Sequence, residues 1–293
     1  MRILHLINTL DPKPESDLHR AQPVTFETVK RAKEYAAELG IDVTLVAACF
    51  EEEKHVVPVW FDEIHSLHAS SIDHPEFEDK RKLPNLSEIF QIAESVSSGH
   101  DLFIYSNIDI GVQPFFYQMC AMHAVSGVDG FSVTRRTIDR EAGDYTRWCT
   151  DPGLEHAGDD CFVIRAEYLR NFDIPEVYTG VAWYDRVILL NCAIQALHFE
   201  RRKNDYWTFH LGNDETWRNP KANTIAKWNY DELRKLVERL ESTHGKLFEM
   251  PRVMDVFAYP YKILGFRVPT VSQKISRLFR LRRGVLTKIW PAS

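Results

Sequence analysis

An Asn-x-Asp pair closes an apolar run near the middle of the chain. Residues 102–105 are apolar, and Asn107 and Asp109 follow within the expected strand Leu102–Ile110. Strand alternation would place both side chains on one face, at the sheet edge where open α/β folds bind ligands. Hard cations such as Mn²⁺ or Mg²⁺ take oxygen ligands and keep positions open for phosphate. The segment predicts a metal ion that holds a diphosphate; an Asx-turn that closes a strand is the structural alternative.

A histidine in Thr208–Asp214 is the second metal-ligand candidate. His210 follows an aromatic residue, and Gly212 allows a tight turn close to a ligand. An imidazole in this setting could lie beside the ion that Asp109 binds. The alternative is a hydrogen-bonded histidine that serves the fold alone.

Three acids are candidates for work on an acceptor hydroxyl. Asp159 and Asp160 precede a buried strand, where paired acceptors suit a hydroxyl-rich ligand. Asp185 lies in the first turn of an apolar helix and could act as a general base, with Trp183 stacking on a sugar ring. The alternatives are solvated turn acids, and a helix-start acid beside a packed tryptophan.

Two arginines follow each other at the end of another expected strand. The guanidinium groups of Arg135 and Arg136 suit bidentate contacts with phosphate. A surface ion pair is the alternative for each of them.

These residues need a sheet to bring them together. Arg2–Leu10, the helix Thr25–Leu39 and Ile41–Phe50 form a β-α-β unit, which implies parallel strands. Glu51–Leu83 is charged and irregular, and 139–158 is expected to be a loop. Further expected strands are Phe131–Ile138, Asp160–Arg165 and Thr208–Leu211; further expected helices are Pro84–Ser97, Pro114–Val125, Tyr184–Leu197 and Tyr230–Leu240.

The charge of the chain is unevenly distributed. Residues 251–293 contain nine Lys or Arg and one Asp, hence +8, so the net charge of −6 leaves −14 on residues 1–250. The predicted organisation is a domain over 1–250 and a basic amphipathic tail over 251–293. The acidic body disfavours nucleic acid as a partner.

The stretch 271–290 has apolar residues at helical spacing beside basic ones, and a tryptophan near its end. This pattern indicates contact with an anionic membrane surface, while a terminal helix docked on the acidic body is the alternative. No apolar run reaches the roughly 20 residues that span a bilayer, and the first residues read as a strand and not as a signal peptide. The expected location is cytoplasmic, with the inner face of the membrane as a peripheral alternative.

Several segments in this order resemble the GT-A-fold glycosyltransferase-like (nucleotide-diphospho-sugar transferase) family. The resemblance covers roughly residues 1–230; the matching stretches are Gln22–Glu27 with Arg31–Glu34, Tyr105–Pro114, Thr134–Ile138, His156–Phe162 and Thr208–Asp214. It implies a GT-A-like (Rossmann-like) α/β fold, with a mixed, mostly parallel sheet flanked by helices. The charge pattern adds the basic C-terminal helical appendage after this domain.

The resemblance also implies roles for single residues. Asn107 and Asp109 stand where such enzymes carry a metal-binding Asp-x-Asp, although Asn107 replaces the first aspartate. His210 matches the C-terminal metal ligand, and Asp185 matches the acid of the acceptor-side motif. The segment Gly180–Arg186 departs from the family pattern.

The sequence therefore predicts a glycosyltransferase that moves a sugar from a nucleoside diphosphate sugar to a hydroxyl of a glycan or lipid-linked acceptor. The base and ribose would lie near Asn8, Asp11 and Arg31, the ion on Asp109 and His210, and Arg135 or Arg136 near the leaving group. Two alternatives stay open. One is a nucleotidyltransferase, although no Gly-rich loop follows the first strand; the other is a non-catalytic carbohydrate- or membrane-binding protein, which Asn107 favours.

Overall fold

A strand, a helix and a second strand open the fold, and the two strands pair in parallel as the apolar pattern predicts. The computed structural model describes residues 1–139, 143–203, 205–212, 220–251 and 253. The strands are β1 (Arg2–Asn8), β2 (Asp42–Phe50), β3 (Glu63–Leu67), β4 (Leu102–Ser106), β5 (Gly111–Val112), β6 (Gly130–Ile138), β7 (Leu154–Arg165), β8 (Phe199–Arg202) and β9 (Thr208–Leu211).

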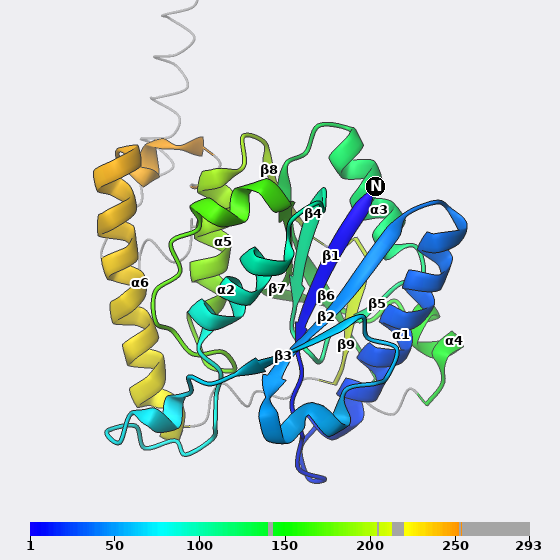
Figure 1. The fold of residues 1–293 in the computed structure, drawn as a ribbon, viewed down its shortest axis with the longest axis horizontal. Helices are drawn as coiled ribbons and strands as arrows, with labels where there is room; N and C mark the ends of the chain where they lie inside the picture. The colour runs from blue at the N-terminus through cyan, green and yellow to red at the C-terminus, as the bar shows by residue number, and fades with distance from the viewer. Residues whose placement is uncertain (140–142, 204, 213–219, 252, 254–293) are drawn as a thin grey trace, which may run out of the picture. The chain divides into compact units, whose positions relative to one another are not determined.

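The helices cover both faces of the sheet. They are α1 (Leu18–Glu38), α2 (Leu86–Val96), α3 (Phe116–Val125), α4 (Tyr145–Thr150), α5 (Tyr184–Gln195) and α6 (Asn223–His244). Helices α1 and α3 lie on one face, and α2, α5 and α6 lie on the other (Figure 1). Short 3-10 turns cover Glu51–Val56, Ser71–Asp73, Ala166–Asn171, Pro220–Ala222 and Leu247–Glu249.

The strand order in the described residues is β3-β2-β1-β4-β7-β6-β9-β5, with β8 beside β6. Five of the eight strand pairs are parallel, and the direction reverses between β4 and β7. The expected GT-A-like mixed, mostly parallel sheet with flanking helices is thus confirmed. The basic appendage falls almost wholly outside the described residues.

The main hydrophobic core lies between the sheet and the pair α1 and α3. Ile3, Leu45 and Ile104 from three neighbouring strands pack there against Val29 of α1 and Phe116 of α3, and all five are fully buried. This packed layer fixes β1 and β4 against the two helices.

Helix α1 begins seven residues earlier than expected and contains Pro23. The expectation was wrong because a proline normally marks the first turn of a helix. Here Ala21, Gln22, Val24 and Thr25 are buried, and this packing outweighs the hydrogen bond that the proline cannot make.

The expected loop 139–158 was also wrong in part, because it contains α4 and the first half of β7. That half pairs with β6, with Glu155 opposite Arg136. Because its residues are mostly polar, no apolar run marks this half as a strand. The short strands β3 and β8 escaped notice for the same reason.

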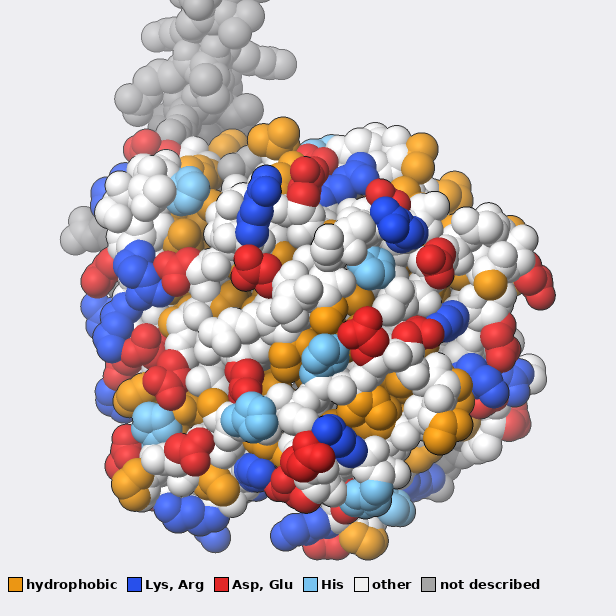
Figure 2. Space-filling view, viewed as in Figure 1, with side chains coloured by type: hydrophobic (Ala, Val, Ile, Leu, Met, Phe, Trp, Pro, Cys, Tyr) orange, Lys and Arg blue, Asp and Glu red, His pale blue; other side chains and the backbone are white. Residues whose placement is uncertain are grey.

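The face shown in Figure 2 carries acidic and basic side chains that intermingle around apolar ones. In the described residues, no helix combines the length and the apolar character that crossing a bilayer requires. The segment 271–290, predicted to contact membranes, lies outside the described residues.

Candidate functional site

The site lies at the edge where β4 ends. Strand β7 runs antiparallel to β4 and pairs Cys161 with Ser106, so residues 154–160 extend beyond the end of β4. The carboxyl half of β6 lies beside that extension and pairs Thr137 with His210 of β9. The turn after β4 therefore meets side chains from three strands that the sequence separates widely.

Asp109 and His210 form a buried pair at this edge. Asp109 Oδ2 lies 3.1 Å from His210 Nε2, and the Nδ1–H of His210 donates to the carbonyl of Gly212 across 2.8 Å. Asp109 Oδ1 is buried and accepts no hydrogen bond from a described residue. Burial opposes both charges, but the attraction between the partners raises the pKa of His210. His210 and Arg135 together lower the pKa of Asp109 to about 2.

Strand β4 ends at Ser106, four residues earlier than expected. The N–H of Asn107 donates to the carbonyl of Asp160 across 3.2 Å, and the N–H of Ile110 donates to the carbonyl of Asn107 across 3.2 Å. These bonds close a turn, so the alternation expected for Asn107 and Asp109 was wrong. The two side chains have different partners within one site.

Asn107 links helix α5 to the far side of the site. Tyr184 donates its hydroxyl proton to Asn107 Oδ1 across 2.9 Å, and Asn107 Nδ2 donates to Asp160 Oδ1 across 3.3 Å. Asp160 Oδ2 lies 3.4 Å from Nη1 of Arg135, whose side chain is 8% exposed. The chain of contacts brings a buried positive charge close to the Asp109–His210 pair.

Asp159 is fully buried and lies in a separate ion network whose two arginines are partly exposed. Its Oδ1 accepts from Ser132 Oγ and Arg201 Nε, each across 2.8 Å. Its Oδ2 is 2.6 Å from Arg201 Nη2 and 3.4 Å from Arg186 Nη1. Two arginines already hold this carboxylate, so its contacts favour a structural role.

Asp185 lies in the first turn of α5, within electrostatic reach of Asp160, and its side chain is mostly buried. Burial, with the charges of Asp159 and Asp160, raises its pKa, although Arg186 Nε lies 3.4 Å away and opposes the shift. Trp183 precedes the helix with a left-handed backbone (φ 84°), and its ring makes an edge contact with Tyr230 at 5.3 Å between centroids. A bulky residue at positive φ is uncommon and marks strain that its surroundings must hold.

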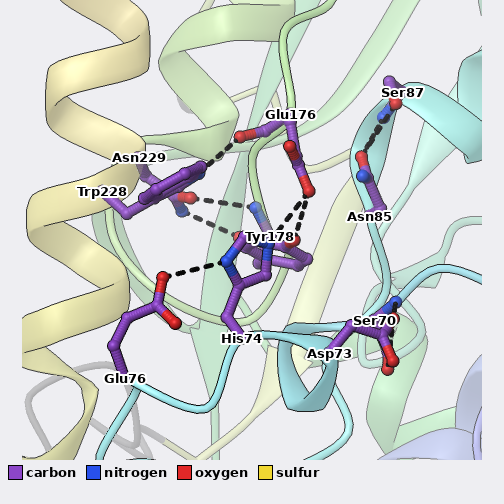
Figure 3. Close-up of polar contacts among 10 residues, drawn as sticks. All are labelled: Ser70, Asp73, His74, Glu76, Asn85, Ser87, Glu176, Tyr178, Trp228 and Asn229. Carbon is purple, nitrogen blue, oxygen red and sulfur yellow. Dashed lines mark hydrogen bonds and ion pairs between the residues drawn. The ribbon is translucent and has the colours of Figure 1, made fainter.

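The segment before Trp183 is held by α6 and by the loop that carries His74 (Figure 3). Asn229 Oδ1 accepts from the N–H of Tyr178 across 2.9 Å, and Asn229 Nδ2 donates to the carbonyl of Tyr178 across 2.8 Å. His74 lies 3.1 Å from both Glu76 and Glu176 through its two ring nitrogens. Asn229 Nδ2 also donates to the carbonyl of Ala182 across 3.1 Å, so α6 holds the residue directly before the strained Trp183.

We call Asp109, His210, Asn107, Asp160 and Arg135, with the residues that contact them, the Asp109 cluster. Four other predicted residues have their described contacts outside this cluster. Arg136 donates to the carbonyls of Pro152 and Gly153, on the opposite strand face from Arg135. Asn8 ends β1, next to β4, and its amide donates to the carbonyl of Ala48 across 3.0 Å.

The other two residues of this group are more exposed. Asp11 lies 3.5 Å from His55. Arg31 binds Glu27 and stacks on Tyr145, beside an open groove of about 620 Å³ between α1 and α4.

Sequence reasoning missed two residues of the cluster. Tyr184 was seen only as the start of a helix, and nothing near it in the sequence points to Asn107. His156 was seen within a matching stretch but received no role. No local spacing marks His156, because the register of β7 against β6 shifts along this segment.

Asp109 and His210 are the described residues that best fit a divalent cation. In the described part of the chain, no group of three His, Cys, Asp or Glu side chains could hold a metal ion. Two protein ligands nevertheless suit Mn²⁺ or Mg²⁺ when diphosphate and water complete the shell. The unpartnered Asp109 Oδ1 and the Gly212 bond that orients His210 agree with this fit.

No protein-family model matches the chain, and no curated protein matches it in sequence. Among solved structures, residues 1–349 of TarS from S. aureus, in complex with UDP-GlcNAc, give a TM-score of 0.50 at 8% identity. That alignment covers 88% of this chain and 80% of the other. The catalytic domain of Drosophila β1,4-galactosyltransferase 7, in complex with xylobiose, gives 0.43 at 8% identity over 76% and 79% of the two chains. The similarity to TarS shows a shared GT-A fold.

Proposed function

We propose that the chain transfers a sugar from a nucleoside diphosphate sugar to an acceptor hydroxyl. The observation that carries the proposal is the Asp109–His210 pair with its unpartnered buried oxygen, at the sheet edge where ligands of such folds bind. The fold shared with TarS, whose structure contains UDP-GlcNAc, supports the same reaction class.

Asp109 and His210 would hold Mn²⁺ or Mg²⁺ on the diphosphate. When bound, the ion would act as a Lewis acid and neutralise the leaving group. Arg135 would add a second positive charge from the protein. Its side chain is 8% exposed, and a buried charge acts more strongly on a ligand than one in water.

The acceptor would be activated by Asp185, with Asp160 as the second candidate. The bond between the anomeric carbon and the diphosphate breaks, the acceptor oxygen bonds to that carbon, and its proton passes to the carboxylate. The raised pKa of Asp185 favours this role, because a general base works best when its pKa approaches the working pH. Trp183 would pack on the sugar ring. Asp159 is not proposed to act on the acceptor, because Arg186 and Arg201 already bind it.

The base and ribose would lie along the end of β1, at Asn8 and Asp11, which neighbours the turn after β4. Asn107 would support this side by holding the turn and not by binding the ion. A role for Arg31 requires the nucleotide to reach the groove beside Tyr145. The acceptor would be a glycan or a lipid-linked sugar, and contact of 271–290 with a membrane stays a prediction.

Thermal unfolding tests the proposal with UDP-, GDP- and CMP-sugars, each with and without Mn²⁺. A ligand at 100 times its dissociation constant adds about 2.7 kcal/mol to the free energy of unfolding. We expect one donor class to stabilise the chain in a Mn²⁺-dependent way, and Asp109→Asn to abolish this effect. Asp231→Asn, an exposed acid on α6, is the matched control and should respond as the wild type does.

Product analysis separates the alternatives. Released nucleoside diphosphate, or monophosphate from a CMP-sugar, supports sugar transfer. A nucleoside monophosphate joined to a sugar would indicate nucleotidyl transfer instead. Stabilisation by none of these donors would favour a non-catalytic protein and contradict the proposal.

A further inference from the structure

The imidazole of His156 lies close to Gly158 in the candidate site. His156, Gly158 and Asp160 lie in the part of β7 that extends beyond β4, where the register of β7 against β6 shifts. A Cβ atom at Gly158 would lie 2.9 Å from His156 Nε2 and 3.5 Å from Asp160 Oδ2. The imidazole and the Asp160 carboxylate therefore both lie where a side chain at Gly158 would project, and the glycine leaves that space to the ring.

The ring of His156 forms no hydrogen bond or ion pair with a described residue. His5 provides the contrast within the same protein, because Tyr117 and Ser106 satisfy both of its ring nitrogens. Histidines that serve the fold alone are normally satisfied in this way. His156 is instead half-buried at the edge of the site, and neither of its ring nitrogens bonds to a described residue.

The charges around His156 are those of the proposed site. Burial and then Arg135 lower the pKa of His156, while Asp160 and Asp109 oppose the shift and His210 adds to it. The imidazole is consequently neutral at pH 7, with one nitrogen that donates and one that accepts. A neutral ring of this kind suits a hydroxyl group, which needs both.

We propose that His156 contacts a hydroxyl of the transferred sugar and that Gly158 is required to leave room for its ring. The inference rests on the proposed function. The sugar is bonded directly to the diphosphate, and His156 lies within electrostatic reach of Asp109 and His210, which would hold that diphosphate. The acceptor is the other source of a sugar hydroxyl, and the test distinguishes the two.

The test compares a sugar nucleotide with its free nucleotide, in Mn²⁺ and by calorimetry. The probes are UDP-GlcNAc with UDP, or GDP-mannose with GDP, whichever pair stabilises the wild type. We expect His156→Ala and Gly158→Ala each to weaken the sugar nucleotide about 3- to 10-fold, the range of one neutral hydrogen bond. The free nucleotide should keep its affinity within about 2-fold, since neither change touches its site.

A double variant provides the matched control. Once His156 is alanine, a Cβ at Gly158 has no ring to displace, so His156→Ala/Gly158→Ala should bind no more weakly than His156→Ala. His156→Gln, which retains a donor and an acceptor, should recover part of the affinity. His65→Ala on the edge strand β3 should leave both affinities unchanged.

Three results would overturn the proposal. Unchanged affinity for the sugar nucleotide in both single variants would mean that His156 contacts the acceptor sugar or no sugar. An equal loss for the free nucleotide would show that His156 acts on the nucleotide or on the fold. Wild-type protein that binds no nucleotide would overturn the proposed function, a failure that is visible before any variant is made.

Discussion

The side-chain amide nitrogen of Asn107, Nδ2, donates to Asp160 Oδ1 across 3.3 Å. The residue two places before Asp109 is therefore hydrogen-bonded to a second acid, Asp160. An aspartate at this position would set two carboxylates against each other. The Asn-x-Asp sequence therefore reflects a local hydrogen bond, and the asparagine cannot be replaced by an acid without a cost.

Asn107→Asp should destabilise the fold and should not tighten Mn²⁺ binding. The change replaces a donor with a second negative charge, and we expect a loss of about 1–3 kcal/mol at neutral pH. One of the two carboxyl groups will have a raised pKa, so the loss should shrink as the pH falls through that value. Urea unfolding of the wild type and the variant, from neutral pH downwards, measures the difference in the free energy of unfolding.

The same substitution at Asn85 is the control. Asn85 caps α2 by accepting from the N–H of Ser87, and a carboxylate is equally suited to that position. Asn85→Asp should leave the free energy of unfolding within about 0.5 kcal/mol. Equal losses at both positions would contradict the interpretation of Asn107.

Tyr184→Phe should reduce transfer more than it reduces nucleotide binding. It removes the hydroxyl that orients Asn107 and leaves Asn107 Oδ1 without this donor. We expect about a 3- to 10-fold lower kcat with little change in the affinity for nucleotide. Steady-state kinetics beside calorimetry provide the readout, and Tyr35→Phe, an exposed tyrosine of α1, serves as the control. A fall in affinity alone would show that the hydroxyl acts on the nucleotide.

Asp159→Asn should destabilise the protein strongly. The change removes the fully buried carboxylate charge that Arg186 and Arg201 share, and both arginines are themselves partly buried. Breaking a buried ion pair by removing one partner costs roughly 3–5 kcal/mol. Chemical denaturation measures the loss, with Asp231→Asn as the exposed control. A loss below about 1 kcal/mol would show that the network is not structural.

His74 should make the stability fall as the pH rises above neutrality. Burial lowers its pKa, but hydrogen bonds to Glu176 and Glu76 prevail and raise the pKa above the ordinary value. The stabilisation is complete below the unfolded pKa of about 6.5 and is lost as the pH passes through the raised folded value. Asp73 adds negative charge nearby, and Lys80 faces Glu76.

Urea unfolding at about pH 6 and about pH 8.5 tests the prediction for His74. His74→Gln keeps a polar side chain but cannot be protonated, so it should flatten this part of the pH profile. Glu76→Gln and Glu176→Gln should each flatten it in part. An unchanged profile in His74→Gln would assign the pH dependence to other groups.

The sequence predicts the parts of the fold whose pattern is local. Strand β9 matches its expected bounds, because Thr208–Leu211 is buried and bordered by turn residues. The apolar part of β4 is equally clear, and the structure places Asp109 and His210 3.1 Å apart at the expected sheet edge. Their proposed role toward an ion stays a prediction.

The rest depends on partners distant in the sequence. The turn at Asn107 is set by the carbonyl of Asp160, and the polar half of β7 is a strand because β6 runs beside it. Tyr184 gains a role only when α5 is placed against the end of β4. No periodicity in a single segment contains this information.

The distance along the chain between Asp109 and His210 has a consequence for synthesis. The two residues are 101 positions apart, and β9 must pair with β6 before they meet. A chain still on the ribosome, or a fragment cut before Thr208, would hold the first strands of the sheet while lacking half of the pair. If the proposed ion site is correct, binding that depends on it should therefore appear only after β9 has emerged.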